Sequence, residues 1–439
     1  MKNQKLKVLL IIEQCNPELA SVPLVGYNFY EGISRWCDTS LVTHERNKLA
    51  LRKVHPDRDI TYIYESDFIK WYFQITSKIS KIKGRTIWPL YATLTYPVHS
   101  EFNHLVYNKF KNSIIRGDYD IVHSITPMMP RYPVKTIKAC KQTPFIIGPV
   151  NGGVPFPEGF KDVSRKEFSY LNFLRTVGRF IIPGYRETYE KANLILAGST
   201  YTLNLINDLF NIEKEQIELF YENGIKSSFI KESEFKFKDN NKINLLFVGR
   251  LVPYKAADIL IEAISKLNCS IQRKIVLTIV GDGAERGNLK QQVQKLNLQE
   301  QVYFAGWVEQ EETLEYYRKS DIFCFPSLRE FGGAVVLEAM ANGLPCIVVN
   351  NGGIGEYVTE ETGIKINPVS REFVVRELKK SIEQLVSDRI LRQNMSFKAI
   401  ARAKEFTWTV KAKKIVEFYS KVIADGEASK NEKAKSANI

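Results

Sequence analysis

Residues 325–340 read FPSLREFGGAVVLEAM, and this stretch decides how we interpret the rest of the chain. It follows an apolar, strand-forming segment, Asp321 to Phe325, crosses a turn with two glycines and enters a helix-forming run. Glu330 lies in the turn, and Glu338 follows about two helical turns later. Unpaired amides at the amino end of a helix, together with the helix dipole, favour an anion. The stretch therefore predicts two acceptors for hydroxyl groups around a cradle for phosphate.

The length and composition are those of a globular protein with two domains. At 439 residues the chain exceeds one ordinary domain, and two domains of about 200 residues are expected. With 44% hydrophobic and 25% charged residues, wholesale disorder is excluded. No apolar run approaches the roughly 18 residues of a transmembrane helix, and the amino end passes into a strand without a signal-peptide pattern. We therefore expect a cytoplasmic location.

Positive charge is concentrated in part of the first half. Between Lys70 and Lys141 there are twelve Lys or Arg residues against three acidic ones, a net +9, which suggests an acidic partner on one face. Basic and aromatic residues form no recognisable nucleic-acid module, so nucleic acid is not the expected partner. Six scattered cysteines without a Cys-x-x-Cys pair favour buried free thiols. All five histidines lie within the first 123 residues, which excludes a histidine-ligated metal in the second half.

Strand-like and helix-like segments alternate along the whole chain, and this pattern predicts doubly wound α/β sheets. The first strand, Leu6 to Glu13, is almost continuously apolar, as in a parallel sheet buried on both faces. The other strands expected in the first half are Ser40 to Thr43, Ile60 to Tyr64, Asp120 to Ser124, Pro144 to Gly148, Leu194 to Ala197 and Ile217 to Tyr221. Those expected in the second half are Ile243 to Val248, Lys274 to Val280, Val302 to Ala305, Asp321 to Phe325, Pro345 to Val349 and Ile364 to Asn367.

A polar, charged run after Asn223-Gly224 marks the expected domain junction. We expect Rossmann-like domains at 1–225 and 226–408. A final helix at 409–423 is expected to return toward the first domain, and a polar tail at 424–439 is expected to be disordered.

Two cations follow the first strand of the second domain. Gly249-Arg250 ends that strand, and Lys255 begins the next helix. Ligands of open α/β sheets bind at the carboxyl ends of strands, where a guanidinium and an ammonium could neutralise two phosphates. Positive charge at a helix start opposes the helix dipole, which favours this interpretation over two ordinary surface cations. Further glycine turns at Gly281-Asp282-Gly283 and Asn351-Gly352-Gly353 predict one site along this edge.

Together these motifs resemble the C-terminal half of a retaining glycosyltransferase of family 4. The matching motifs are Gly249-Arg250 with Lys255, Gly281-Asp282-Gly283, Phe304-Ala305-Gly306, Pro326-Ser327, the two glutamates of EFGGAVVLE and Asn351-Gly352-Gly353. The match is specific from about Ile243 to Pro368 and weaker over Asp120 to Gly224. The resemblance implies the GT-B fold, in which two Rossmann-like domains with parallel sheets face a central cleft. It also implies a nucleotide-diphosphate sugar as co-substrate, transfer with retained anomeric configuration, and no bound metal or other cofactor.

The resemblance assigns roles residue by residue. Arg250 and Lys255 would bind the donor diphosphate, Glu330 would face the sugar and Glu338 would bind the ribose hydroxyls. Amides near the sugar and the phosphates would come from Phe331, Gly332, Gly333, Ala334 and Val335. The other donor-binding positions would be Gly249, Gly281 and Gly283, with the base near Gly306, Trp307 and Val308. His123 matches the position where many relatives place a histidine against the transferred sugar; the alternative is a satisfied histidine at a strand end.

Two departures from the family pattern stand out. Ala256 replaces the glycine that relatives usually have after the diphosphate lysine, a change we expect to be tolerated. The glycine-rich loop expected after the first strand is replaced by residues 15–23, CNPELASVP, so a backbone approach to the diphosphate from there is not supported. Asn151-Gly152-Gly153 could supply part of the first domain's wall instead, or simply form a loop.

Residues 68–85 predict a basic amphipathic helix. Its apolar residues fall within about 100° of one face, with lysines beside them. Such a helix could lie on an anionic membrane, at its inner face, and receive a lipid-linked acceptor; the alternative is an ordinary helix that packs its stripe on the sheet. The function expected is transfer of a sugar to a hydroxyl of a glycan or lipid-linked glycan, in cell-surface polysaccharide or glycolipid synthesis. A nucleotide-sugar epimerase and a non-catalytic nucleotide-sugar-binding protein of the same fold remain as alternatives.

Overall fold

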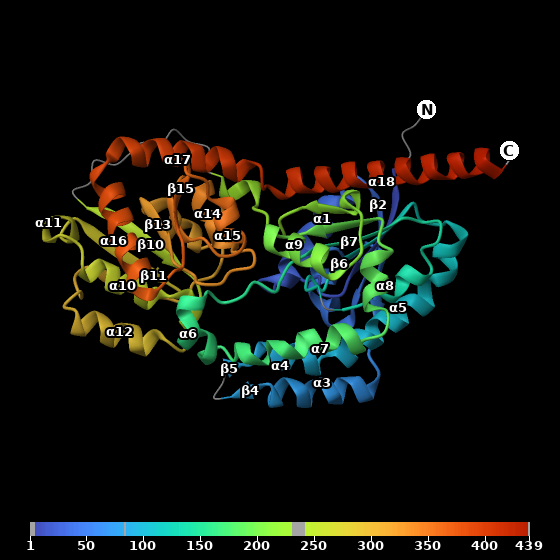
Figure 1. Ribbon diagram of the computed structural model, residues 1–439, viewed down its shortest axis with the longest axis horizontal. Coiled ribbons are helices and arrows are strands. Elements are labelled where there is room, and N and C mark those ends of the chain that lie inside the picture. The colour runs from blue at the N-terminus through green and yellow to red at the C-terminus, as the bar shows by residue number, and fades with distance from the viewer. Residues whose placement is uncertain (1–4, 83–84, 131, 231–241, 438–439) are drawn as a thin grey trace. The chain divides into compact units, whose positions relative to one another are not determined.

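The computed structural model describes residues 5–82, 85–130, 132–230 and 242–437, and the chain forms two compact α/β units (Figure 1). Unit 1 comprises Met1–Gly153, Tyr170–Glu222 and Trp408–Ile439, and unit 2 comprises Val154–Ser169 and Asn223–Thr407. Most of the polar run expected at the junction, 231–241, lies outside the described residues.

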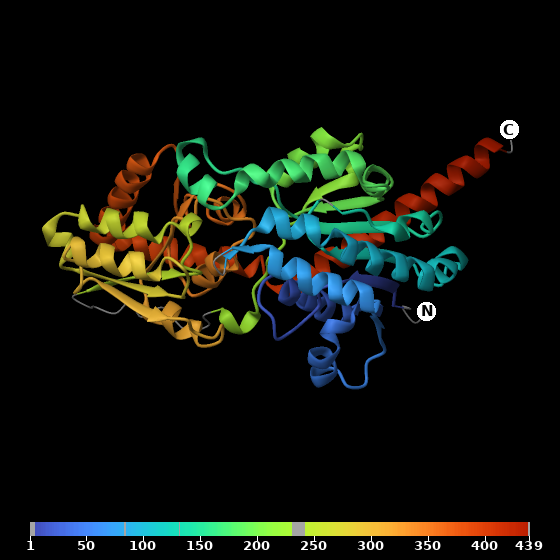
Figure 2. The same ribbon diagram turned by 90° about the horizontal axis from the view of Figure 1, so that it is seen from below.

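Unit 1 is built on a parallel sheet of seven strands in the order β3-β2-β1-β6-β7-β8-β9. The strands are β1 Lys7–Ile12, β2 Asp38–His44, β3 Ile60–Ile63, β6 Ile121–Thr126, β7 Phe145–Val150, β8 Leu194–Ala197 and β9 Ile217–Leu219. Successive side chains of a strand point to opposite faces, and here Leu9 and Ile11 enter one apolar core while Leu10 and Ile12 enter the other. Helices cover both faces of the sheet (Figures 1 and 2). The continuous apolar run at the amino end is therefore a strand buried on both faces, as predicted.

The helices of unit 1 include several that the sequence did not predict, chiefly those between 170 and 190. They are α1 Val22–Ser34, α2 Lys48–Val54, α3 Asp67–Ile79, α4 Trp88–Leu94, α5 Tyr96–Arg116, α7 Phe173–Ile181, α8 Tyr185–Glu190, α9 Thr200–Leu209 and α18 Trp408–Ala437. β4 Lys81–Ile82 and β5 Arg85–Thr86 pair as a short antiparallel sheet. The 3-10 turns are η1 Glu45–Asn47, η2 Lys135–Lys138, η4 Ser169–Asn172, η5 Lys214–Gln216 and, in unit 2, η3 Glu158–Phe160, η6 Ser227–Phe229 and η7 Pro253–Lys255.

Unit 2 is built on a parallel sheet of six strands in the order β12-β11-β10-β13-β14-β15. The strands are β10 Ile243–Val248, β11 Ile275–Val280, β12 Val302–Gly306, β13 Ile322–Phe325, β14 Cys346–Val349 and β15 Gly363–Ile366. The helices are α6 Lys161–Lys166, α10 Ala257–Ser265, α11 Cys269–Gln272, α12 Arg286–Lys295, α13 Thr313–Lys319, α14 Ala334–Ala341, α15 Gly353–Tyr357, α16 Arg371–Ser387 and α17 Arg389–Lys404. The two parallel sheets confirm the predicted α/β fold class.

The unit boundaries differ from the expected division at two places. Residues 154–169, expected in the first domain, pack within unit 2, where Gly159 lies so close to the backbone of Val369 that a Cβ would overlap it. The last helix also differs from the expectation of a helix at 409–423 followed by a disordered tail, because α18 continues to Ala437. Nine of the fourteen residues at 424–437 are Ala, Glu or Lys, which favour helix, and this explains why the helix does not stop at 423.

Helix α18 packs on the sheet of unit 1 beside α1. Ile415, Phe418, Tyr419 and Val422, spaced at three and four residues, enter one of the two cores of this unit. The carboxyl-terminal helix is therefore a structural part of unit 1.

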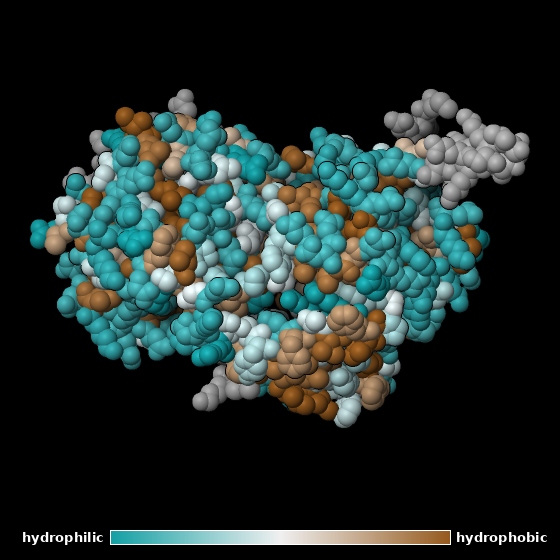
Figure 3. Space-filling view, in the orientation of Figure 1, coloured by the Kyte–Doolittle hydropathy of each residue, from teal (hydrophilic) through white to brown (hydrophobic). Residues whose placement is uncertain are grey.

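Helices α3, α4 and α7 lie together on the surface of unit 1. Apolar side chains are exposed on all three, and Figure 3 shows an apolar surface where these helices lie. The stripe of α3 that could have packed on the sheet instead leaves Phe68, Trp71 and Ile79 exposed. Within the described part of the chain, no helix is long and apolar enough to cross a membrane.

We expect Ile415→Ala to lower the free energy of unfolding by about 2–4 kcal/mol, because it removes a fully buried side chain from the core that α18 shares with the sheet. Val410→Ala on the same helix is the control, since Val410 is 45% exposed and should change stability by less than about 1 kcal/mol. Urea denaturation followed by far-UV circular dichroism measures both. Equal effects of the two substitutions would show that α18 is not docked in unit 1.

Candidate functional site

The sequence-predicted donor residues converge at the point where the strand order of unit 2 reverses. β10 lies between β11 and β13, so the loops that follow β10 and β13 leave the same edge of the sheet on opposite sides of this switch point. In open α/β sheets, ligands bind at the carboxyl ends of the strands at such a point. Arg250 and Lys255 come from the loop after β10, and Glu330 comes from the loop after β13.

Lys255 and Glu330 form an ion pair across the switch point. The ammonium of Lys255 contacts Oε2 of Glu330, which also accepts a 3.1 Å hydrogen bond from Ser327 Oγ. Lys255 is only 9% exposed, and its ammonium lies 4.8 Å from the ring centre of Phe325. The pair is therefore largely shielded from water, which strengthens the attraction between its charges. Among the described residues, none donates a hydrogen bond to Oε1 of Glu330.

Arg250 extends the positive charge toward solvent. Its side chain is exposed, and Nη2 donates a 2.8 Å hydrogen bond to the hydroxyl of Tyr254. The ring of Tyr254 in turn lies 5.3 Å from the ammonium of Lys255. Arg250 and Lys255 are thus brought together, as the sequence predicted. Because Glu330 balances only one of the two cations, one positive charge is left at this edge for an anion.

The amino end of α14 is built from glycines that let two loops touch. Gly333 precedes the helix in a left-handed conformation with φ 61°, and no side chain of the described residues caps the helix there. Glu330 and Gly352 form a backbone bridge, and Gly352, at φ 91°, is so close to the Glu330 carbonyl that a Cβ would overlap it. The amides at this helix end are therefore presented without competing side chains, as an anion site requires.

Glu338 lies in the second turn of α14, where the sequence placed it, but its carboxylate is already held inside unit 2. Oε1 accepts from Gln310 Nε2 and Oε2 accepts from the hydroxyl of Tyr317, both at 2.9 Å. Burial raises the pKa of Glu338, and these two hydrogen bonds offset part of that rise. Each carboxylate oxygen has a second lone pair, so a ligand hydroxyl can still be accepted where space allows.

The remaining predicted donor residues line the same edge. Gly281 N donates a 2.6 Å hydrogen bond to Gly306 O, so the loops after β11 and β12 are joined beside the loop after β10. Gly249 and Gly283 lie in these loops, and Val308 follows Trp307. Trp307 is exposed directly after β12, where a flat base could stack on it. Phe331, Gly332, Ala334 and Val335 flank the amino end of α14.

Ala256, which replaces the glycine usual in relatives, is buried in a left-handed conformation with φ 56° between η7 and α10. For a residue with a Cβ this conformation costs roughly 1–2 kcal/mol. The substitution is accommodated, but glycine would avoid this steric cost.

His123 is a buried, hydrogen-bonded histidine of unit 1 rather than an exposed group. It has no accessible surface, and its ring nitrogens bond to Tyr419 Oη at 2.7 Å and to Gly148 O at 2.8 Å. Burial lowers the pKa of His123 to about 4. The arrangement corresponds to the alternative left open by the sequence, a satisfied histidine, because both nitrogens are occupied and neither reaches solvent.

The carboxyl edge of the unit 1 sheet instead holds a hydrogen-bonded pair of a carboxylate and a histidine that sequence reasoning missed. Glu13, directly after β1, has Oε2 2.6 Å from Nδ1 of His99, a residue of α5. The ring of His99 stacks on Tyr132 with ring centres 4.6 Å apart. No spacing in the sequence signals a pair whose members are 86 residues apart. The glycine-poor loop at 15–23 lies next to this edge and leads into α1.

Asn151-Gly152-Gly153 connects the two units in sequence, and Asn151 belongs to a buried network of unit 1. Its Oδ1 accepts hydrogen bonds from Ser199 Oγ at 3.0 Å and Thr202 Oγ1 at 2.9 Å. The following residue, Val154, already lies in unit 2, where its carbonyl accepts a 2.7 Å hydrogen bond from Arg329 Nε. Asn351 Nδ2 likewise donates to Pro155 O at 3.1 Å. The segment that begins at Val154 is therefore tied to the loop that contains Glu330 and to the loop after β14.

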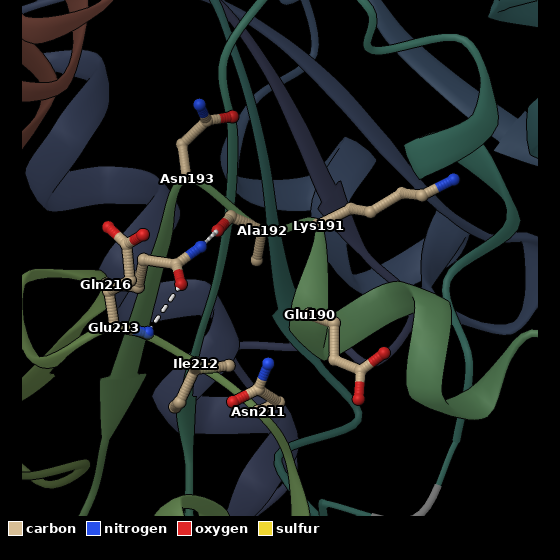
Figure 4. A pocket seen from close by; sticks show the side chains of 8 residues that line it. All are labelled: Glu190, Lys191, Ala192, Asn193, Asn211, Ile212, Glu213 and Gln216. Carbon is tan, nitrogen blue, oxygen red and sulfur yellow. Dashed lines mark hydrogen bonds between the residues drawn. The ribbon is translucent and has the colours of Figure 1, made fainter.

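A depression of about 700 Å³ elsewhere in unit 1 lies at the amino end of β8, on the opposite edge from the strand ends considered above (Figure 4). Gln216 joins its walls by donating to Ala192 O at 3.0 Å and accepting from Glu213 N at 2.8 Å. The bond from Glu213 N belongs to a capping box between Glu213 and Gln216 at the start of a 3-10 turn, which is a structural role. We therefore place the candidate site at the unit 2 switch point. The described residues contain no group of three or more His, Cys, Asp or Glu placed to hold a metal ion.

Comparisons with known proteins show which chains and which fold this protein resembles. Residues 228–402 match the family model for glycosyl transferases group 1. An uncharacterized glycosyltransferase of Methanocaldococcus jannaschii is 28% identical over 247 residues, which are 49% of this chain and 62% of that protein. A second one from the same organism is 28% identical over 338 residues, which are 74% of this chain and 80% of that protein. The crystal structure of Anabaena HepE in complex with UDP has a TM-score of 0.60 at 16% identity and covers 94% of this chain and 100% of its own. This structural likeness confirms the predicted GT-B fold.

We expect Gly352→Ala to lower the free energy of unfolding by at least about 2 kcal/mol, because a Cβ there would overlap the Glu330 carbonyl at a positive φ. Gly287→Ala is the control: it lies in α12 with nothing within 4 Å of the added Cβ, and it should raise stability by about 0.5–1 kcal/mol. Thermal and urea denaturation measure both. A neutral Gly352→Ala would contradict the close contact of the two loops.

The buried His123 predicts a pH dependence of stability. Its pKa is lower in the folded chain than the usual 6.5, so the folded state resists protonation and stability is lost as pH falls through the window from 6.5 toward 4. Between pH 7 and pH 5 this loss should be about 2 kcal/mol. Urea denaturation at both pH values measures it, and His123→Gln should lack this part of the loss. The same pH dependence in both proteins would show that His123 is not held neutral.

Proposed function

We propose, from the premise that residues 228–402 belong to the glycosyl transferases group 1 family, that this protein transfers a sugar from a nucleotide-diphosphate donor to an acceptor hydroxyl. One observation carries the proposal. Arg250, Lys255 and Glu330 meet at the switch point of unit 2 beside the uncapped amino end of α14. This arrangement supplies two cations and free amides for phosphates and a fixed carboxylate for sugar hydroxyls.

The roles follow from how charge changes during the reaction. As the bond between the sugar and the donor phosphate breaks, negative charge grows on the departing phosphate. Arg250, Lys255 and the amides at the start of α14 stabilise this charge where it develops. Because these groups are fixed before the reaction, little reorganisation is needed. The positive charge that a bound metal could supply is then available from the chain itself, and we propose a reaction that needs no metal.

Glu330 is better suited to orient the sugar than to attack it. Its Oε2 is engaged by Lys255 and Ser327, which lowers the nucleophilic character of that oxygen and leaves Oε1 to accept from a sugar hydroxyl. We propose transfer with retained configuration, in which the acceptor oxygen bonds to the sugar on the face that the phosphate leaves. The acceptor proton passes to an oxygen of the departing phosphate. Glu338, held by Gln310 and Tyr317, would accept the ribose hydroxyls.

The acceptor we propose is a glycan or a lipid-linked glycan, as used in cell-surface polysaccharide or glycolipid synthesis. The exposed apolar residues of α3 support this class, because a chain that carries them would rest at an anionic membrane surface through 68–85. In Anabaena HepE the bound nucleotide is UDP, which makes UDP-sugars the first donors to test here. Donor incubated without acceptor should be hydrolysed slowly, whereas an epimerase would return an altered nucleotide sugar and a binding protein would leave the donor intact.

We expect Arg250→Ala or Lys255→Ala to lower the rate of transfer at least about a hundredfold, because loss of one charge-stabilising donor costs about 3 kcal/mol. Steady-state kinetics with the donor found by screening measures this effect. Lys266→Ala is the control, since Lys266 pairs with Glu262 on α10 away from the switch point. Near-normal turnover by the purified double variant Arg250→Ala/Lys255→Ala would refute the assignment.

A further inference from the structure

Helix α7 is a surface helix that presents its apolar face outward. None of its nine residues is buried, and Phe180 and Ile181 are 83% and 71% exposed. At about 100° of rotation per residue, its large apolar side chains fall within an arc of about 120° around the helix axis. They are Phe173, Leu174, Val177, Phe180 and Ile181. A helix of a globular protein normally buries such a stripe, so this one is available to something outside the chain.

The polar side of α7 faces the protein instead. Arg175 and Arg179 are centred opposite the apolar stripe, and the Nε of Arg179 is buried. A Cβ added at Gly153 would lie 3.3 Å from Nη1 of Arg175, so this guanidinium lies close to the backbone of Gly153. The two arginines fix the orientation of α7 about its own axis. Rotating the helix so that the apolar stripe faced the protein would move both guanidinium groups away from the protein. The outward apolar face is therefore a property of how the helix is seated.

The apolar surface continues over the neighbouring helices. α7 packs against α4, and α4 packs against α3. Trp88 at the start of α4 and Phe68, Trp71 and Ile79 on α3 are exposed as well. Figure 3 shows an apolar surface in this part of unit 1. A continuous patch over three helices goes beyond the scattered apolar residues that are normal on a soluble protein.

Charge distinguishes the two kinds of partner that could cover this surface. The segment 66–96, which contains α3 and α4, holds five Lys or Arg residues and one Asp, not counting the two arginines of α7 that face the protein. A second copy of the chain would bring the same positive charge against itself, which opposes a symmetric dimer. A bilayer with anionic lipids offers the opposite charge and an apolar interior, and tryptophans such as Trp71 and Trp88 favour the boundary between them.

We propose that α3, α4 and α7 together form a surface that binds an anionic lipid bilayer, with the apolar face of α7 inserted among the lipids. The helices lie in the plane of the membrane boundary and do not cross it. This proposal rests on the proposed function only where it assumes a lipid-linked acceptor. Binding of the bilayer itself does not depend on the transfer reaction. Insertion of α7 would hold unit 1 at the membrane surface, where such an acceptor is found. The segment 68–85 alone would not provide this insertion.

The test is sedimentation of the full-length protein with vesicles of phosphatidylcholine, with and without phosphatidylglycerol. We expect binding that depends on phosphatidylglycerol and weakens with salt. The double variant Phe180→Ser/Ile181→Ser should bind at least about tenfold more weakly, since it removes two large apolar side chains from the inserted face. The matched control is Leu49→Ser/Ile390→Ser, which changes residues 87% and 71% exposed on α2 and α17 and should bind as the unchanged protein does.

Two further measurements separate the outcomes. Donor hydrolysis in solution should be the same in the α7 variant and the unchanged protein, so that a failure of membrane binding and a failure of the proposed function are told apart. Vesicle binding that survives Phe180→Ser/Ile181→Ser, or that is lost equally in the control variant, would overturn the proposal. So would a concentration-dependent dimer in solution that the α7 variant abolishes, because the face would then be an interface between two copies.

Discussion

The ion pair between Lys255 and Glu330 is the interaction on which the site depends. It joins the loops that follow β10 and β13, the two strands on either side of the switch point in unit 2. Few water molecules can screen it, because both side chains are mostly buried. In the absence of a ligand the pair neutralises itself and keeps both side chains in place. A diphosphate would then meet a lysine that is already positioned, and the unbalanced charge of Arg250 would favour its approach.

Backbone contacts support this pair from the side of α14. Gly352 allows its loop to touch the carbonyl of Glu330, and Arg329 and Asn351 hold the carbonyls of Val154 and Pro155. The segment 154–169 is thereby part of unit 2, although more than fifty residues of unit 1 follow it in the chain. A site built in this way draws its rigidity from segments far apart in sequence. Such support is what keeps charged groups in the geometry that catalysis requires.

Much of the fold and of the arrangement of the candidate site could be predicted from the sequence, because both depend on local patterns. Apolar runs identified the parallel strands, and the glycine turns with Arg250, Lys255 and Glu330 follow those strands directly. The state of His123 could not be predicted, since its partner Tyr419 lies on a helix 296 residues later. The extent of α18 was misjudged because the polar composition of 424–437 was taken as disorder, although most of these residues are good helix formers. The apolar spacing of α7 is present in the sequence, but its outward orientation depends on neighbours that only the structure shows.

The central claim is that the switch point of unit 2 binds the diphosphate of a nucleotide sugar. Titration calorimetry with nucleoside diphosphates and the corresponding nucleosides tests it most directly, for the unchanged protein and for Lys255→Met. We predict that at least one nucleoside diphosphate binds about thirtyfold or more tightly than its nucleoside, which corresponds to about 2 kcal/mol from charge-assisted contacts. This difference should shrink in Lys255→Met, whereas the affinity for the nucleoside should stay the same. Equal binding of diphosphate and nucleoside, or an unchanged difference in Lys255→Met, would contradict the account.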